Sequence, residues 1–264
     1  MAKLRRTRGI VLVTRDVQET DRLALILSEK EGKIPLLVKR ARRMESPYGA
    51  IFEPTNTVEF IYYVREGPYL LKEGSLLRLF PGLRGDRERL RAALEGLAMV
   101  AELLPERSPE PRALRLVQVF LRELEGGLDP GLGLLAFQLK FLSLLGQGPH
   151  LEGCVRCGSQ EGLTWCPAEG LLCHGCGGRG EEVPPNIWRG MRMLLQLPLG
   201  TAGVLRLTRV EKDLVKQLLE EFRGHLRGGP SPQDDCHGAP QTIRYVPGGV
   251  AERTKARDLK SLEG

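Results

Sequence analysis

Two CxxC pairs near the middle of the chain constrain its fold more than any other feature. Cys154 and Cys157 form the first pair, Cys173 and Cys176 form the second, and fifteen residues separate the two pairs. Two cysteines three positions apart in a tight turn direct both thiolates at one ion, and a second such turn completes a tetrahedron of soft ligands. Glycines beside both pairs allow the sharp turns that such a site needs. The spacing therefore predicts a four-cysteine site for one zinc ion.

Other uses of these cysteines are less favoured. Disulfides are not expected, because six cysteines in 264 residues, without a signal peptide, indicate a reducing compartment. A redox dithiol would explain one pair and leave the second unexplained. Cys166 follows Trp165 in an apolar turn or short strand and is interpreted as a packing residue, and His174 would crowd a site that its neighbours already fill.

The predicted site is structural rather than catalytic. A catalytic zinc keeps an open position for water, whereas four thiolates close the coordination sphere. The sequence has neither an HExxH motif nor a glutamate placed as in the zinc deaminases. We therefore expect a closed metal site that stabilises a loop-rich segment, no catalytic residues, and no enzymatic activity.

The overall charge indicates an anionic partner. The formal net charge is +6, and 41% of the residues are hydrophobic, as in a globular chain. Nucleic acid is the first candidate for the partner, and an acidic membrane surface is the second. The chain has no apolar run long enough to span a membrane, and its basic start is not followed by an apolar signal region. A cytoplasmic protein is expected.

The first eighty residues have the pattern of a small β-barrel. Five strands are predicted, separated by turn residues such as Glu31–Gly32 and Gly67–Pro68, over residues 9–14, 21–29, 34–41, 55–65 and 69–80. Alternating apolar residues support two of them, Leu23, Leu25 and Leu27 in the second and Val58, Phe60 and Tyr62 in the fourth. A five-stranded OB-fold and an SH3-like barrel both fit this count.

Helical periodicity replaces strand periodicity after Arg84. Apolar spacing predicts helices over residues 90–104, 114–124, 130–145 and 187–197, and a last helix that begins at the Thr208–Glu211 capping box and ends near Gly228. The tail at 230–264 has no apolar periodicity, so we expect it to be disordered, with Cys236 and His237 unpaired.

Basic residues are concentrated in the barrel region. One group follows a strand into its loop, Lys33, Lys39, Arg40, Arg42 and Arg43, and a second lies at the N-terminus, Lys3, Arg5, Arg6 and Arg8. They are either a solvated strand end and tail, or a groove that follows a phosphate backbone. Tyr48 and Phe52 in the next loop suit base stacking or the core equally well. Arg189 and Arg192 on a later helix are explained as well by an exposed face as by a ligand.

Several local runs together resemble the RecO family of bacterial recombination mediators. The most specific is the junction from Phe141–Gly146 through Pro149 to Cys154-Val-Arg-Cys157-Gly158. The others are Gly9-Ile-Val-Leu, Glu19-Thr-Asp21, Glu31-Gly32-Lys33 and Lys39-Arg-Ala-Arg-Arg43. The resemblance covers about residues 5 to 228 and does not extend into the tail.

The resemblance implies an α+β fold with an N-terminal five-stranded OB-fold barrel and an all-α C-terminal domain that carries a four-cysteine zinc module. The parts would be the barrel at 1–82, helices at 83–149, the zinc module at 150–182, helices at 183–229 and the tail at 230–264. The implied metal ligands, for one structural zinc ion, are Cys154, Cys157, Cys173 and Cys176.

The resemblance also implies a function in DNA repair and homologous recombination. RecO-like proteins bind single- and double-stranded DNA, anneal complementary strands and, with RecR, help to load RecA onto DNA coated by single-stranded-DNA-binding protein. The implied location is cytoplasmic and nucleoid-associated, and no membrane is involved. The implied DNA contacts are Lys33, Lys39, Arg40, Arg42 and Arg43, with Arg8, Arg189 and Arg192 as further candidates. A protein-interaction scaffold and a zinc-dependent nucleic-acid enzyme stay as alternatives.

Overall fold

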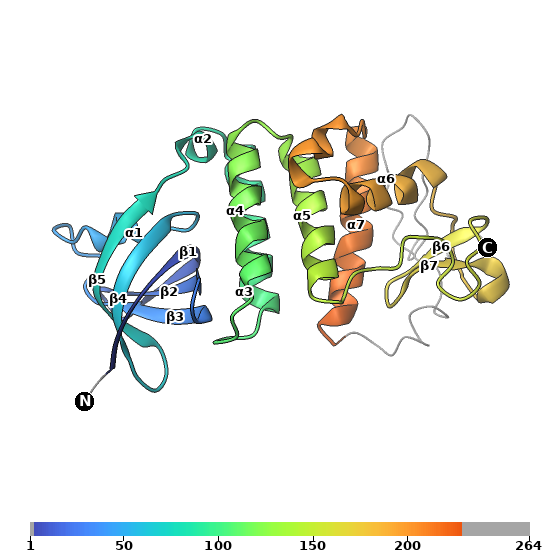
Figure 1. Cartoon of the computed structure of the whole chain (residues 1–264). Helices are drawn as coiled ribbons and strands as arrows, with labels where there is room; N and C mark the ends of the chain where they lie inside the picture. The colour runs from blue at the N-terminus through green and yellow to red at the C-terminus, as the bar shows by residue number, and fades with distance from the viewer. Residues whose placement is uncertain (1–2, 229–264) are drawn as a thin grey trace, which may run out of the picture. The chain divides into compact units, whose positions relative to one another are not determined.

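The computed structural model describes residues 3–228 (Figure 1). The predicted tail, with Cys236 and His237, lies outside the described residues. The chain divides into two compact units, one formed by Met1–Gly146 and Pro198–Gly203, the other by Gln147–Leu197 and the residues from Val204 onward. The finer five-part division stays a prediction.

The N-terminal part of the first unit is a closed five-stranded barrel. The strands are β1 (Lys3–Val17), β2 (Asp21–Ser28), β3 (Gly32–Val38), β4 (Thr57–Val64) and β5 (Tyr69–Arg78). They close in the order β1-β2-β3-β5-β4, and all pairs are antiparallel except β3 with β5. This is the strand order of an OB-fold, so the α+β prediction with an OB-fold barrel is confirmed and the SH3-like alternative is not.

Strand β1 is longer than its apolar run suggested. Its first half pairs with β4, its second half pairs with β2, and a register shift between Val11 and Val13 lies where it bends along β2. The part of this strand before Gly9 was not predicted from the sequence, because its basic residues point outward and leave no apolar run. Arg6 and Arg8 both form ion pairs with Glu59 on the neighbouring β4. Cross-strand pairs of opposite charge thus accompany the extended pairing.

The barrel core is formed by one face of each strand. The residues that form it are Val11, Ala24, Ile26, Ile34, Leu36, Val38, Ala41, Phe52, Val58, Phe60, Tyr62 and Tyr69. The expected alternation on β4 is confirmed. On β2, Ala24 and Ile26 line the core, whereas of the alternating leucines Leu23 and Leu25 are half-buried and Leu27 is buried. Both faces of β2 are apolar, so alternation alone could not distinguish them.

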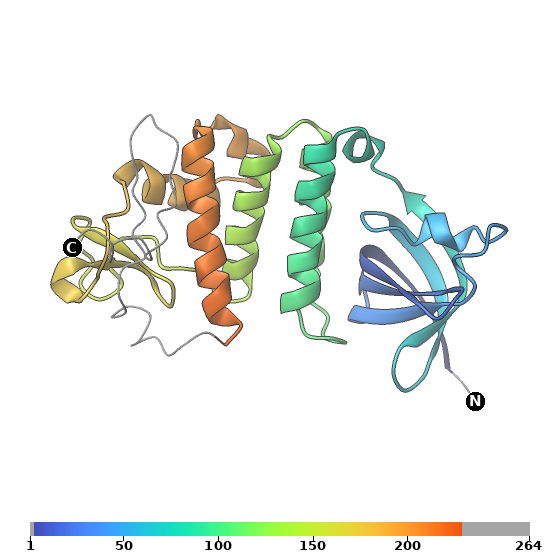
Figure 2. The ribbon, with the colours of Figure 1, turned by 180° about the vertical axis from the view of Figure 1, so that it is seen from behind.

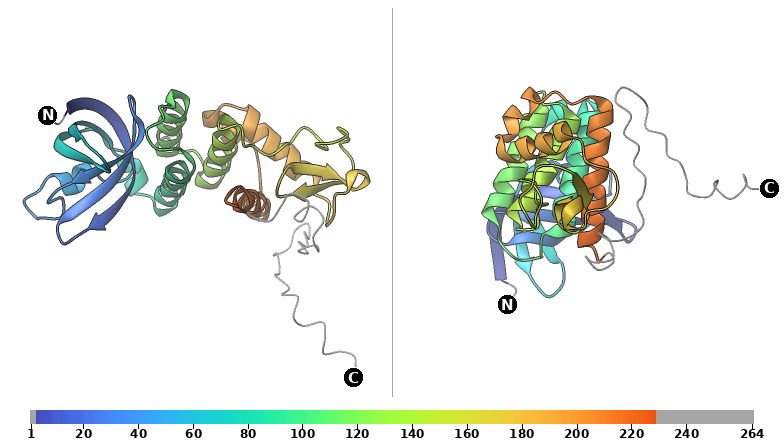
Figure 3. Two further views of the ribbon diagram at one scale, coloured as in Figure 1. Left: turned by 90° about the horizontal axis from the view of Figure 1, so that it is seen from below. Right: turned by 90° about the vertical axis from the view of Figure 1, so that its right-hand side faces the viewer.

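Helices complete the first unit. They are α1 (Tyr48–Ile51), α2 (Pro81–Arg84), α3 (Arg87–Leu103), α4 (Pro111–Glu125) and α5 (Pro130–Leu144). Figure 2 shows α3 beside the barrel, and the left view of Figure 3 looks along α3 and α4. At Gly96 in α3 an added Cβ would lie 2.5 Å from the ring of Phe120, so α3 and α4 approach closely there. The Phe120 ring stacks on Phe137 of α5 at 4.2 Å between centroids.

The segment after α3 joins the helices to the barrel. The Arg107 amide donates a hydrogen bond of 2.8 Å to the Lys33 carbonyl at the start of β3. An added Cβ on Gly32 would lie 2.1 Å from the Ser108 carbonyl oxygen, so only glycine fits between the two segments. The Arg107 guanidinium also lies 5.0 Å from the centre of the Tyr69 ring. These contacts fix the orientation of β3 within the first unit.

The second unit contains a small hairpin and two helices. Its elements are β6 (Leu163–Cys166), β7 (Gly170–Cys173), the 3-10 helix His174–Cys176, α6 (Pro185–Gln196) and α7 (Arg209–Leu226). Trp165 on β6 packs against Phe222 of α7, with ring centroids 6.2 Å apart. Cys166 is buried in β6 and is disulfide-bonded, contrary to the expectation of no disulfides and to its interpretation as a residue that only packs. Within residues 3–228, no helix combines the length and the apolar content needed to cross a membrane.

The predicted capping box of α7 is confirmed and provides a stability test. The Thr208 hydroxyl accepts from the Glu211 amide, and the Glu211 carboxylate accepts from the Thr208 amide at 2.8 Å. We expect Thr208→Ala to lower the free energy of unfolding of the second unit by about 1 kcal/mol, because it leaves a helix amide without its acceptor. Chemical denaturation followed by circular dichroism measures this loss. Thr208→Ser keeps the acceptor oxygen, and an equal loss in that variant would contradict the capping explanation.

Candidate metal centre and nucleic-acid interface

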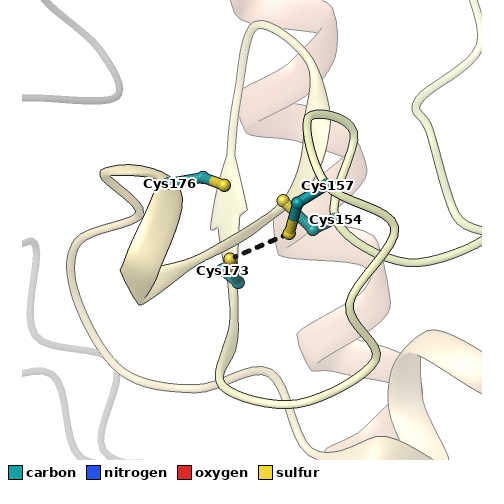
Figure 4. Close-up of side chains that lie close together, drawn as sticks. All are labelled: Cys154, Cys157, Cys173 and Cys176. Carbon is teal, nitrogen blue, oxygen red and sulfur yellow. Dashed lines mark hydrogen bonds between the residues drawn. The ribbon is translucent and has the colours of Figure 1, made fainter.

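The structure brings the four predicted cysteines together. Cys154 and Cys157 lie in the turn before the hairpin, Cys173 ends β7, and Cys176 lies in the following 3-10 helix (Figure 4). The Gly158 amide donates to the Cys154 carbonyl at 2.8 Å and closes the first turn. The Gly178 amide donates to the Cys173 carbonyl at 3.0 Å and closes the second. Two similar turns on neighbouring segments therefore present two thiols each to a common point.

The geometry of the four thiols fits a tetrahedral metal ion. Their Sγ atoms all lie within 4.8 Å of one another, and those of Cys157 and Cys173 are 3.6 Å apart. Zinc with four thiolates at about 2.3 Å holds the sulfur atoms about 3.8 Å apart, so a small contraction of the cluster satisfies it. Among the described residues, this is the one group of histidine, cysteine or acidic residues close enough to hold a metal. His174 directs Nδ1 at the Gly178 carbonyl, at 3.1 Å, and is not part of the group.

The electrostatics of the cluster favour a bound cation. Burial raises the pKa of the Cys154 thiol, but backbone hydrogen bonds from Cys173, Cys157 and Arg156 outweigh burial and lower it to about 6. The hydrogen bonds that the Cys176 thiol makes with Cys157 and Cys173 raise its pKa to about 12. The Cys154 thiolate thus forms readily, whereas the raised pKa values of Cys173 and Cys176 oppose their ionisation beside it. A soft divalent cation removes that conflict, because it stabilises all the thiolates together.

Four of the predicted DNA-contact residues lie in one turn, which we call the cationic turn: Lys39, Arg40, Arg42 and Arg43. All four are exposed, and the turn follows the end of β3. Hydrogen bonds from two of its amides hold it against the β1–β2 turn: the Arg42 amide donates to the Thr20 carbonyl at 3.0 Å, and the Arg40 amide donates to the Asp21 side chain at Oδ1, at 2.8 Å. Sequence reasoning had not given Thr20 and Asp21 this supporting role. The Glu19-Thr-Asp21 run was the available signal.

The side chains of the cationic turn are not equally available. Arg42 forms an ion pair with Asp16 at 3.2 Å and donates to the Glu19 carbonyl at 3.0 Å. Within residues 3–228, the side chains of Lys39, Arg40 and Arg43 have neither an ion pair nor a hydrogen bond. Within the described residues, three exposed cations without partners therefore lie in one five-residue stretch of the barrel, 39–43. Such charges can displace counterions from a phosphate backbone without first breaking an ion pair within the protein.

Three further candidates lie elsewhere. Arg8 is on β1 and pairs with Glu59 at 3.0 Å. Arg189 and Arg192 are on α6 in the second unit, where Arg189 lies over the Trp188 ring and Arg192 pairs with Glu152 at 3.2 Å. Each of these guanidinium groups has a partner within its own unit. Their contact with DNA stays a prediction.

Lys33 has a position unlike the other predicted contacts. Its residue is only 7% exposed, and its Nζ donates to the Ala101 carbonyl near the end of α3 at 2.6 Å. Burial lowers the pKa of its ammonium group, although Glu106 acts in the opposite direction. The charge is thus used to join β3 to α3, and we leave Lys33 out of the surface that we propose below.

A substitution at Lys33 separates the two roles. We expect Lys33→Met to lower the free energy of unfolding by about 1.5–3 kcal/mol, because a hydrogen bond from a charged donor is lost and the part-buried Ala101 carbonyl loses this donor. Thermal denaturation beside the exposed-site control Lys39→Met measures the effect. An unchanged melting temperature together with weaker DNA binding would instead place Lys33 in the DNA interface.

The two aromatic candidates for base stacking belong to the barrel. Phe52 is fully buried in the core, and its ring lies in edge contact with Phe60 at 6.3 Å. Tyr48 is half-buried and packs on Phe52 at 6.1 Å. The structure therefore supports a core position for Phe52 rather than base stacking.

Comparison with known proteins identifies the family. The model "Recombination protein O N terminal" matches residues 1–80, and "Recombination protein O C terminal" matches residues 84–232. The curated DNA repair protein RecO of Rubrobacter xylanophilus is 35% identical over 210 residues, covering 76% of this chain and 84% of that protein. The RecO proteins of Symbiobacterium thermophilum and Bacillus subtilis are 33% and 28% identical and cover 76% and 84% of this chain, and 83% and 90% of their own lengths. The chain therefore belongs to the recombination protein O family, whose members act in DNA repair and recombination.

Proposed function

We propose that the protein is a non-enzymatic mediator of homologous recombination that binds single- and double-stranded DNA through the cationic turn on its OB-fold barrel. The observation that carries the proposal is the set of three exposed cations, Lys39, Arg40 and Arg43, which have no partner in the described part of the chain and lie on a turn fixed by hydrogen bonds. OB-folds bind single strands in a basic groove, so this placement suits a phosphate backbone.

The mechanism is electrostatic. Cations that replace counterions along the phosphates gain the entropy of counterion release, so binding is insensitive to sequence and weakens with salt. A surface that partly neutralises two complementary strands also lowers the repulsion between them. The protein would thereby promote annealing without forming or breaking a covalent bond.

The four-cysteine cluster is proposed to hold one structural zinc ion. Cys154, Cys157, Cys173 and Cys176 would supply four thiolates and leave no position for water or substrate. Bound zinc supplies folding energy to the turns that hold these cysteines. The hairpin β6–β7 and the two cysteine turns form a segment with little core of its own, so a metal is a suitable stabiliser.

Family membership supports the proposed partners. These are RecR, single-stranded-DNA-binding protein, and RecA, which the protein would help RecR to load onto coated DNA. A nucleoid-associated location in the cytoplasm would accompany this role. Each partner is a proposal that a binding experiment with purified components can test.

The direct test is DNA binding over a range of salt. Fluorescence anisotropy with labelled single- and double-stranded oligonucleotides of unrelated sequence is expected to give similar affinities for each, with log K falling linearly in log [salt]. Annealing of complementary oligonucleotides, followed by energy transfer between end labels, should accelerate over the same salt range. Absence of binding at low salt would contradict the proposal.

Two alternatives predict different results. A zinc-dependent nucleic-acid enzyme would cleave or deaminate labelled DNA in a metal-dependent manner, which a closed four-thiolate site does not support. A protein-interaction scaffold would bind partners and leave DNA unbound when those partners are absent. Incubation of labelled DNA with the protein alone, followed by product and binding analysis, distinguishes all three.

A further inference from the structure

One hydrophobic side chain on the barrel is completely exposed to solvent. Met44 follows the cationic turn directly and has a relative exposure of 101%, the largest of the exposed hydrophobic residues in the described part of the chain. Val204, the next, is 64% exposed. A single exposed apolar side chain is common on protein surfaces, but this one directly follows the cationic turn, where a bound strand would lie beside it.

Met44 is held at a structured position. The Arg43 amide donates to the Arg40 carbonyl at 3.2 Å, and the Ser46 amide donates to the Arg43 carbonyl at 3.0 Å, so hydrogen bonds close the turn on both sides of Met44. Ala41 before it is buried in the barrel core, and Tyr48 after it packs on Phe52. The backbone thus displays the side chain at a defined place beside the cations.

The surroundings of Met44 favour a nucleic-acid strand over a protein surface. Protein interfaces have a core of several adjoining apolar residues, and here Ala41 is buried and Tyr48 half-buried. A lone apolar side chain beside three cations instead suits a nucleic-acid strand, because the cations can contact its phosphates and the apolar side chain can contact the faces of its bases. Methionine is among the residues that proteins insert as wedges between bases, and its flexible thioether adapts to base faces of any identity.

We propose that Met44 inserts between neighbouring bases of the DNA strand whose phosphates the cationic turn binds, and so unstacks one base step. This inference rests on the proposed function, because the cations must first hold a strand beside the turn. Met44 would thus contact the bases, whereas the cations contact only the phosphates. An unstacked strand presents its base edges to a complementary strand, which suits annealing.

The test compares Met44→Ser with Met44→Leu on oligonucleotides that contain 2-aminopurine, whose fluorescence rises when it unstacks. The wild type and Met44→Leu are expected to raise the fluorescence of bound DNA. Met44→Ser should abolish that rise and weaken binding about fivefold to tenfold. Its salt slope should not change, because no phosphate contact is lost. Val204→Ser is the matched control for loss of an exposed hydrophobic side chain, and both serine variants should keep the wild-type melting temperature.

The outcomes separate the inference from the function on which it rests. Salt-dependent binding by the wild type with unchanged fluorescence, or an unchanged response in Met44→Ser, would overturn the insertion and leave the proposed function intact. Failure of the wild type to bind DNA would overturn the proposed function itself. If Met44→Ser retains the DNA response but loses binding to a protein partner or to anionic vesicles, the residue serves that other surface and the insertion is refuted.

Discussion

Cys173→Ser is expected to remove bound zinc and to unfold the segment that the four cysteines hold together. Cys173 is 7% exposed, it ends β7, and its thiol lies 3.6 Å from that of Cys157. Even an outer-shell partner of a metal ligand contributes about 10- to 100-fold to affinity, so loss of a thiolate ligand should cost more than a hundredfold. Metal content by mass spectrometry should fall from one zinc per chain in the wild type to well below one.

The same variant should lose stability in the second unit. Free energies of zinc binding to small structural sites are about 10–16 kcal/mol, and this energy contributes to folding because the unfolded chain has no preformed site. Thermal denaturation of the wild type in the presence of a strong chelator should reproduce the loss seen in Cys173→Ser. Arg156→Gln is a suitable control, since it changes an exposed residue of the same turn and removes no thiol. Full zinc content in Cys173→Ser, or a metal-free wild type with normal stability, would show that the cluster is not a zinc site.

Neutralising the three unpaired cations is expected to have the largest effect on DNA binding. Each phosphate contact on a single strand contributes about 0.7 to the slope of log K against log [salt], which corresponds to about fivefold in affinity at 0.1 M salt. The triple variant Lys39→Gln, Arg40→Gln, Arg43→Gln should therefore bind single-stranded DNA about a hundredfold more weakly at 0.1 M salt and reduce the slope by about 2. Anisotropy titrations at several salt concentrations measure both values.

A control with the same change in net charge is available within the first unit. Arg91, Arg112 and Arg122 have side chains that are 63%, 73% and 57% exposed, and each already pairs with a nearby glutamate. Their replacement by glutamine removes three positive charges far from the cationic turn in sequence, on α3 and α4. Equal losses of DNA affinity in the two triple variants would indicate that overall charge, rather than the cationic turn, governs binding. An unchanged slope in the first variant would remove the turn from the interface.

Much of the fold followed from local patterns in the sequence. Helix ends were predictable where a cap is encoded nearby, as at Thr208, which accepts from Glu211 as expected. The paired spacing of the four cysteines was sufficient to predict the cluster, because two turns of that length leave few other arrangements for the thiols. The apolar alternation of β4 was equally informative, since its outward positions are polar or half-buried.

Other features depended on contacts between segments distant in the sequence. The N-terminal half of β1 is strand because β4 offers partners for its backbone and Glu59 for its arginines, and neither is encoded locally. Of the hairpin β6–β7, only a short strand at Cys166 was expected, as an alternative to a turn, since each strand has only four residues. Strands that short carry too few residues for a periodic signal.

The sequence by itself determined the types of chemistry present: a soft-metal site, a basic barrel and a largely helical C-terminal half. Only the tertiary structure decided which charges are available. Lys33 and Lys39 are both lysines of the same basic group, yet Lys33 donates to Ala101 inside the unit, whereas Lys39 is exposed and has no partner among residues 3–228. Burial and ion pairing arise from neighbours far along the chain, and they set the free energy of bringing a charge to a phosphate. A basic cluster in a sequence therefore predicts a partner, whereas the fold selects the residues that can bind it.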